Sequence, residues 1–86
     1  MQKKLLKFPC PFPIKIVGEA NLTFEGVVVG ILRQHVPDLG EAAITLKYSQ
    51  NGKYISMTAN INAKSQEQLD GLYYALSSEP LVLFVL

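Results

Sequence analysis

The sequence predicts an α+β sandwich in which strands and helices follow one another in the order βαββαβ. Three observations support this fold class. Apolar and polar residues alternate strictly from residue 54 to residue 63, as in a strand with one buried face. Asn51-Gly52 stands just before that run and indicates a hairpin. Two further segments, residues 23–36 and the residues between Ser65 and Pro80, space their apolar side chains as amphipathic helices do.

The chain is expected to begin with an extended, proline-containing lead-in over residues 1–12. Three prolines alternate within Phe8–Pro13, where they hold the backbone extended and remove N–H donors from any strand ladder. This segment should therefore be a lead-in or lie at an edge. The first strand is predicted over Ile14–Gly18, with Lys15 on the face opposite to its isoleucines.

The first helix is predicted over Thr23–Val36. Thr23 is the expected N-cap, Glu25 complements the helix dipole in the first turn, and Pro37 closes the segment. Val29 and Val36 lie off the main apolar stripe of this helix. They are expected to contribute to a surface for another chain.

The hairpin is predicted to join strands over Ala42–Ser49 and Lys53–Ala63. A two-residue type I′ turn at Asn51-Gly52 needs positive φ at both positions, and it pairs Gln50 with Lys53. In this register the apolar residues of both strands face the same side of the sheet. A shift by one residue would turn one set to water, so the register is well determined.

The second helix begins with a capping box, because Ser65 is followed three residues later by Gln68. Leu81–Leu86 then forms the last strand. Right-handed crossovers place both helices on one face of a four-stranded antiparallel sheet in the order 4-1-3-2. The whole chain, residues 1–86, is thus predicted to be a single domain with the ferredoxin-like fold.

Composition excludes several classes of protein. A net charge of +1 gives no global field that would steer the chain onto nucleic acid or an anionic membrane. The longest apolar run is far too short to span a bilayer, and no secretory signal is recognisable at the start. With a single cysteine and no disulfide framework, a cytoplasmic setting is expected.

No catalytic residue, metal ligand or cofactor site is predicted. Cys10 and His35 are the only thiol and imidazole, and Cys10 stands between prolines in an extended segment. No pair of ligands has the spacing of a metal site. The segment after the first strand, Gly18–Gly26, has no arginine or lysine that could hold a phosphate group.

The alternation also predicts an open, polar sheet face. Its expected residues are Lys15, Lys47, Tyr54, Ser56, Thr58, Asn60 and Asn62. RNA-binding domains of this fold stack bases on the open face, so RNA binding is the alternative function. It is not favoured, because stacking takes two or three aromatic side chains and Tyr54 alone qualifies here.

The last strand is apolar on both faces although the topology places it at an edge. A bare hydrophobic edge invites pairing with another chain. We therefore expect a homodimer or a protein partner there, with Leu81, Leu83 and Val85 as the candidate edge residues. Tyr74, which points away from the core side of the second helix, would lie on the same kind of surface.

Several short patterns, taken together, resemble the YbeD-like family of small bacterial proteins over the whole chain. They are Phe8-Pro9 with Pro11-Phe12, Lys15 and Gly18, Arg33-Gln34-His35 with Pro37, Asn51-Gly52-Lys53-Tyr54 with Ser56, Ile61-Asn62-Ala63, Glu67-Gln68, Leu72-Tyr73 and Val85-Leu86. The resemblance implies a fold similar to the ACT regulatory domain, a bacterial cytoplasmic location and a regulatory role near lipoate metabolism. It supplies no catalytic residue.

The ACT likeness draws attention to the loop after the first strand, where ACT domains of metabolic enzymes bind amino acids. The candidate ligand-binding residues are Gly18, Glu19, Ala20 and Asn21. The loop lacks the Asp-x-Pro-Gly-like pattern that many ACT domains show. We therefore predict a non-enzymatic regulatory or adaptor module that binds a protein partner or a small metabolite, with no cofactor and no membrane contact.

Overall fold

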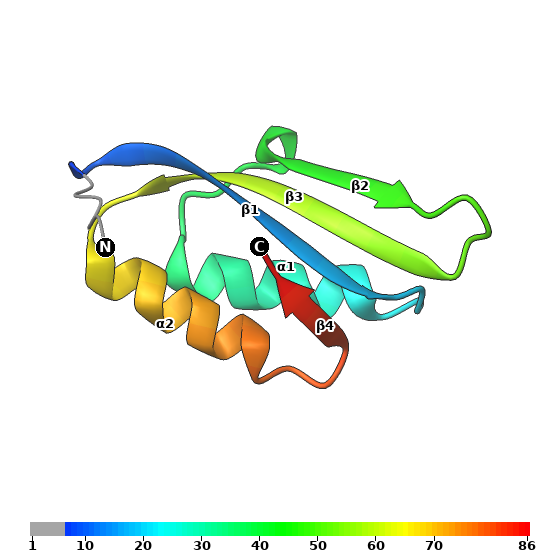
Figure 1. Ribbon diagram of the computed structural model, residues 1–86. Helices are drawn as coiled ribbons and strands as arrows, with labels where there is room; N and C mark the ends of the chain where they lie inside the picture. Colours follow the sequence, from blue (N-terminus) through cyan, green and yellow to red (C-terminus); the bar gives the residue numbers. More distant parts are fainter. Residues whose placement is uncertain (1–6) are drawn as a thin grey trace, which may run out of the picture.

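Figure 1 shows the computed structural model of the chain, which describes residues 7–86. Its elements, in chain order, are β1 (Cys10–Glu19), α1 (Phe24–His35), the short 3₁₀ helix η1 (Glu41–Ala43), β2 (Ile44–Tyr48), β3 (Tyr54–Ala63), α2 (Gln66–Ser77) and β4 (Val82–Val85). The strands form one antiparallel sheet in the order β2-β3-β1-β4, and both helices lie on one side of it (Figure 1). The predicted ferredoxin-like fold and strand order are confirmed.

β1 begins earlier than predicted. It starts at Cys10 rather than at Ile14, and it pairs with β3 along its whole length, from Cys10 opposite Ala63 to Glu19 opposite Tyr54. Residues 10–12 of the predicted lead-in are therefore part of the sheet. Residues 1–6 of that lead-in lie outside the described residues.

The prolines of β1 fit because β4 is much shorter than β1. The Lys15 N–H and carbonyl are directed toward β4, where they bond to the carbonyl and N–H of Leu86 at 3.2 and 2.8 Å. Alternation directs the backbone of Pro11 and Pro13 to that same side, beyond the end of β4. A missing N–H costs no ladder hydrogen bond there, which is where proline is tolerated in a sheet.

The β2–β3 hairpin has the predicted register. Tyr48 lies opposite Ile55, and Leu46 lies opposite Met57. β2 nevertheless begins at Ile44 rather than at residue 42, so the first two residues of the predicted strand do not pair with β3. The reason is η1, in which the Ala43 N–H donates to the Gly40 carbonyl at 3.2 Å instead of to a neighbouring strand.

The hairpin loop is not the predicted type I′ turn. Among the described residues only Gly52 has a positive φ, 72°, whereas a type I′ turn would require it of Asn51 as well. The Gly52 N–H donates to the Ser49 carbonyl at 2.9 Å. The Ser49 hydroxyl and the Asn51 side-chain oxygen then both accept from the Lys53 N–H, each at 3.1 Å. Side-chain acceptors thus close a longer loop without a second positive φ.

Gly52→Val is expected to lower the free energy of unfolding by about 1–2 kcal/mol, because a β-branched residue is strained at positive φ. Nothing lies within 4 Å of the position that a Cβ would take, so the loss would be conformational and not steric. Urea denaturation followed by circular dichroism measures it. Gly40→Val is the control, since Gly40 is equally open and has an ordinary extended backbone with φ −93°. Equal stability of the two variants would contradict the prediction.

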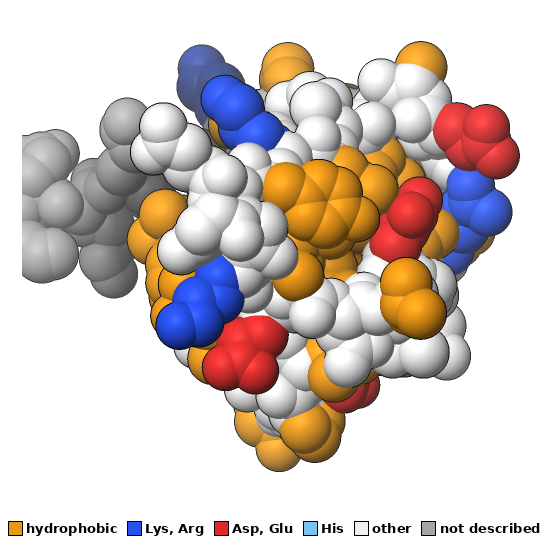
Figure 2. Space-filling view, turned by 90° about the vertical axis from the view of Figure 1, so that its right-hand side faces the viewer, with side chains coloured by type: hydrophobic (Ala, Val, Ile, Leu, Met, Phe, Trp, Pro, Cys, Tyr) orange, Lys and Arg blue, Asp and Glu red, His pale blue; other side chains and the backbone are white. Residues whose placement is uncertain are grey.

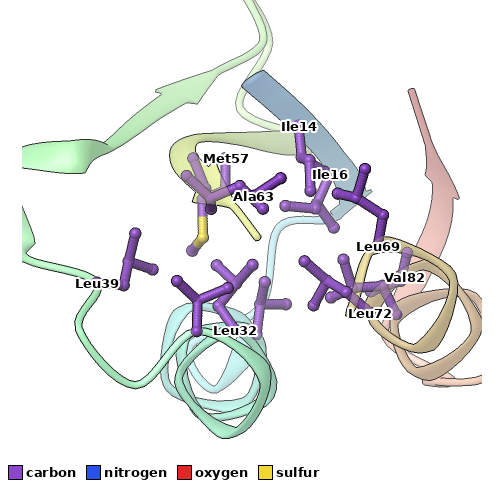
Figure 3. Packing of buried hydrophobic residues seen from close by; sticks show 14 of the residues in the cluster. Ile14, Ile16, Leu32, Leu39, Met57, Ala63, Leu69, Leu72 and Val82 are labelled. Atoms are coloured by element: carbon purple, nitrogen blue, oxygen red, sulfur yellow. The ribbon is translucent and has the colours of Figure 1, made fainter. Parts of the chain in front are cut away.

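The core fills the space between the sheet and the helices. Figure 3 shows Met57 of β3 above Leu32 of α1, with Leu69 and Leu72 of α2 beside Ile16 of β1. The core-facing residues of β3 are all buried, as the alternation predicts: Ile55, Met57, Ala59, Ile61 and Ala63.

Val36 belongs to this core and not to a surface, which corrects the prediction made for it. It is only 2% exposed. α1 ends at His35, and the Leu39 N–H donates to the Val36 carbonyl at 3.1 Å, so the chain turns sharply and carries both apolar side chains inward. Val36 is buried because of this turn, which helical periodicity in the sequence does not predict.

The two helix starts differ in how they are capped. Thr23 occupies the N-cap position of α1 but makes no capping bond with its side chain; its hydroxyl and its N–H both donate to the Asn21 side-chain oxygen, at 2.6 and 2.8 Å. At α2 the predicted cap by Ser65 is present, with the Gln68 N–H donating to the Ser65 hydroxyl at 3.0 Å. The reciprocal half of the capping box is shifted by one residue, because the Gln68 side-chain oxygen accepts from the Lys64 N–H at 2.7 Å. The Gln68 amide also donates to the His35 carbonyl at 2.7 Å, which ties the start of α2 to the end of α1.

Candidate binding surfaces

The open face of the sheet carries the polar residues that alternation assigns to it. Lys15 of β1 lies opposite Thr58 of β3, and Thr58 lies opposite Thr45 of β2, so one polar row crosses three strands. Ser56 and Thr58 are half-buried by their neighbours, whereas Lys15, Lys47, Tyr54, Asn60 and Asn62 are exposed. Both helices cover the other face (Figure 1), so this face is accessible to a partner.

A second aromatic side chain on this face was not predicted. Phe84 of β4 lies opposite Val17 of β1 and is 49% exposed, while Tyr54 of β3 is 41% exposed. β1 runs between the two strands and offers Lys15 and Val17 instead of a ring. The rings thus do not stand on neighbouring strands as a base-stacking platform requires, and the geometry favours RNA binding no more than the sequence does.

The predicted ligand loop, Gly18–Asn21, serves the packing of the fold, and its first two residues, Gly18 and Glu19, belong to β1. A Cβ at Gly18 would lie 2.3 Å from the Leu81 carbonyl oxygen and 2.5 Å from the Phe24 ring, so the glycine allows β4 and α1 to approach β1. The Ala20 N–H donates to the Lys53 carbonyl at 2.9 Å. The Asn21 side chain is already occupied by Thr23, as described above.

The hollow beside this loop is small. It measures about 170 Å³ and brings Glu19, Ala20 and Asn21 next to Pro80, Leu81 and Leu83. Pockets for metabolite-sized ligands usually measure roughly 300–1,000 Å³. The four residues predicted as a ligand loop are therefore together in space, but the hollow that three of them line is too small to enclose a metabolite.

The C-terminal edge strand exposes hydrophobic side chains. Leu83, Phe84 and Leu86 are 52%, 49% and 67% exposed, whereas Leu81 and Val85 are half-buried. Because Leu86 exchanges both of its backbone hydrogen bonds with Lys15, alternation directs the N–H and carbonyl of Val85 away from β1. At Leu83 the pairing with β1 is irregular. The candidate edge thus combines exposed apolar side chains with outward-facing backbone groups.

A groove lies between α1 and β2, and the sequence did not predict it. It measures about 610 Å³. Its lining residues are Leu22, Glu25, Gly26, Val29 and Arg33 on the α1 side, Glu41 of η1, and Ile44 and Leu46 of β2. The two β2 side chains point toward the helix layer but remain half-exposed. The groove is open because of the lateral position of α1 beneath the sheet. The pattern of apolar residues along the sequence does not predict this position.

Hydrophobic side chains also gather at one end of the molecule. Figure 2 looks onto the end where the hairpin loop and the connection from β1 to α1 lie, and it shows an apolar centre surrounded by acidic and basic side chains. An apolar centre with a charged rim is the usual composition of a protein-binding surface.

Titratable side chains are not assembled into a reactive centre within residues 7–86. No buried side chain in this range is polar or charged, and no group of three His, Cys, Asp or Glu residues could hold a metal ion. The His35 Nδ1 donates to the Ile31 carbonyl at 3.1 Å, a bond within its own helix. Burial raises the pKa of Tyr73, whose hydroxyl donates to the Leu86 carbonyl at 3.3 Å.

None of the helices in the described range has the length and apolar character needed to cross a membrane.

The fold is similar to solved ACT-domain structures. The ACT domain from the GTP pyrophosphokinase of Chlorobium tepidum superposes with a TM-score of 0.69 and 22% identity, covering 90% of this chain and 97% of that one. Protein HP0495 from H. pylori superposes with a TM-score of 0.75 and 15% identity, covering 99% of this chain and 89% of that one. At such identities the likeness concerns the fold alone, and it confirms the ACT-like architecture that the resemblance implied.

Sequence relatives cover the whole chain. A UPF0250 protein of Chromobacterium violaceum is 38% identical over 85 residues, which is 99% of this chain and 96% of that protein. A UPF0250 protein of Neisseria meningitidis serogroup B is 42% identical over 82 residues, 95% of this chain and 90% of that protein. A family described as "Protein of unknown function (DUF493)" matches residues 3–86. The resemblance stated from the short patterns is thereby confirmed, and the chain belongs to the DUF493 family of UPF0250 proteins.

Proposed function

We propose that this chain is a non-enzymatic regulatory or adaptor module of the bacterial cytoplasm, which binds a protein partner along the C-terminal edge of its sheet. One observation carries the proposal: β4 is an edge strand, and the apolar side chains at 83 and 84 within it and at 86 directly after it are about half or more exposed. An exposed apolar edge of this kind is a template for an added strand. The likeness to the ACT domain of a GTP pyrophosphokinase supports a regulatory role.

The chemistry of the described side chains supports binding over catalysis. General acid–base or nucleophilic catalysis needs reactive groups within hydrogen-bonding reach of one another in a partly dry site. Here every titratable side chain in residues 7–86 is exposed or half-exposed. Burial raises the pKa of Tyr73, and its hydroxyl donates to a backbone carbonyl.

A protein partner fits the C-terminal edge better than a metabolite fits the neighbouring loop. The small hollow beside Gly18–Asn21 would leave most of a metabolite in water, whereas the outward-facing backbone groups of Val85 can pair with an extended peptide. Added main-chain hydrogen bonds would give affinity, and the apolar side chains of β4 would select a partner strand of similar character.

Leu83→Lys is expected to weaken partner binding at least about tenfold, because it places a strongly hydrated charge at the centre of the apolar edge. The fold should be kept, since Leu83 is 52% exposed. The tagged wild-type chain is used to capture partners from its own cells, and the affinity of the captured protein for both chains is then measured by fluorescence anisotropy.

Thr45→Lys is the matched control, because it adds the same charge to an exposed position on the opposite edge strand. It should leave partner affinity unchanged. A partner that binds Leu83→Lys as well as the wild type would refute recognition at this edge. A thermal-shift panel of amino acids, nucleotides and lipoyl or octanoyl compounds provides a second test. A reproducible rise in melting temperature with one of them would indicate that the ligand is a small metabolite and not a protein.

A further inference from the structure

The groove between α1 and β2 is lined by three charged side chains, of which Glu25 and Arg33 belong to α1 and Glu41 to η1. On α1, Glu25 and Arg33 stand four residues before and four residues after Val29, and all three side chains line the groove. Side chains three or four residues apart share one face of a helix, so the three form a single stripe. Neither Glu25 nor Arg33 makes an ion pair within residues 7–86, where the only ion pair joins Lys64 and Asp38.

We propose that a second copy of this chain docks into this groove, with the two α1 helices antiparallel and the two β2 strands edge to edge about one two-fold axis. In such an interface the same surface occurs on both partners, so each contact is made twice. With the axis passing close to Val29, Glu25 of one copy lies opposite Arg33 of the other. The charge pattern of α1 is therefore complementary to itself, and only in the antiparallel orientation.

The free edge of β2 is compatible with the same axis. Since the Ser49 N–H donates to the Tyr54 carbonyl, alternation directs the backbone groups of Ile44, Leu46 and Tyr48 away from β3. Two such edges can pair antiparallel and join the sheets of both copies. Ile44, Leu46 and Val29 line the same groove, so the middle of β2 and the middle of α1 lie at one level beside the axis.

Apolar surface beside the groove gives this dimer its driving force. Leu22 is fully exposed and Tyr48 is 61% exposed, although both are large hydrophobic side chains. The space is also open to a facing helix, because a Cβ at Gly26 would meet no atom within 4 Å. The edge strand β4 has no charged side chain that could set a self-complementary register. The charge pattern therefore favours a dimer through the β2 edge.

Charge reversal tests the orientation. Arg33→Glu should raise the dimer dissociation constant at least about tenfold, because both ion pairs become contacts between like charges. Glu25→Arg should do the same, and the double variant Glu25→Arg/Arg33→Glu should restore the dimer. Sedimentation velocity over a range of concentrations measures the constants. Glu67→Arg is the matched control, since Glu67 stands in the first turn of α2 as Glu25 does in that of α1, and it should leave the constant unchanged.

Cross-linking locates the axis independently of charge. Helices in contact lie about 8–10 Å apart, which brings facing Cα atoms at the axis to about 3.4–5.4 Å, and the upper part of this range suits a disulfide. In a Cys10→Ser background, Val29→Cys should cross-link quantitatively under mild oxidation, whereas Tyr74→Cys, at the exposed surface of α2, should not. A monomeric wild type at all concentrations, a wild-type dissociation constant for Arg33→Glu, or equal cross-linking of the two cysteine variants would overturn the proposal.

Discussion

Gly18→Ala is expected to lower the free energy of unfolding by about 3 kcal/mol, although it adds a single methyl group. The new Cβ would lie 2.3 Å from the Leu81 carbonyl oxygen, and packed Cβ atoms essentially never come closer than 3.0 Å to another heavy atom. The carbonyl belongs to the backbone that leads into β4 and cannot rotate away. Relief requires β4 to move from β1, which weakens their pairing. Urea denaturation of the purified variant measures the loss.

Gly71→Ala is the matched control for this prediction. It makes the same chemical change within α2, where a Cβ would meet the His35 ring at 3.6 Å, an ordinary contact distance. Because alanine is the better helix former, the control should raise the free energy of unfolding by up to about 1 kcal/mol. A Gly18→Ala variant as stable as the wild type would show that β4 can shift without loss, and it would refute the packing role assigned to Gly18.

The fold could be predicted because several local signals agree with one another. The alternation of β3 sets which side chains are buried, the hairpin register follows from it, and the Ser65 N-cap starts α2 where the structure has it. Each of these signals acts over a few residues and points to the same topology. The strand boundaries that were predicted wrongly depend on distant elements. Pro11, for example, can lie in β1 only because β4 ends before reaching it.

The surfaces were predictable to the extent that strand alternation defines them. Alternation places Lys15 and Thr58 on the open face, and the register shows them side by side. It does not reveal the groove, which depends on where α1 lies under the sheet. Strand alternation also does not distinguish a glycine that lines a ligand loop from a glycine that permits close packing. The packing role of Gly18 becomes visible only in the structure, which shows Leu81 and Phe24 next to it.

Phe24→Ala is expected to be the most destabilising single substitution considered, with a loss of about 3–5 kcal/mol. Phe24 is the first residue of α1 and is fully buried, with its ring lying directly over the backbone of Gly18. Its removal leaves a cavity at the point where α1, β1 and β4 meet. For a chain of 86 residues this loss is a large part of a total stability of roughly 4–13 kcal/mol. Phe84→Ala is the control, since that ring is 49% exposed and its loss should cost less.

The double variant Gly18→Ala/Phe24→Ala separates the two obstacles that surround Gly18. Without the Phe24 ring, an added Cβ still meets the Leu81 carbonyl oxygen, because that atom belongs to the backbone. The double variant should therefore be less stable than Phe24→Ala alone, but by less than Gly18→Ala costs in the wild type, since one of its two clashes is gone. Equal stability of the double variant and Phe24→Ala would mean that only the Phe24 ring excludes a Cβ at position 18 and that β4 can move without loss. If the losses of the two single variants add fully in the double variant, the Leu81 carbonyl alone excludes a Cβ at position 18.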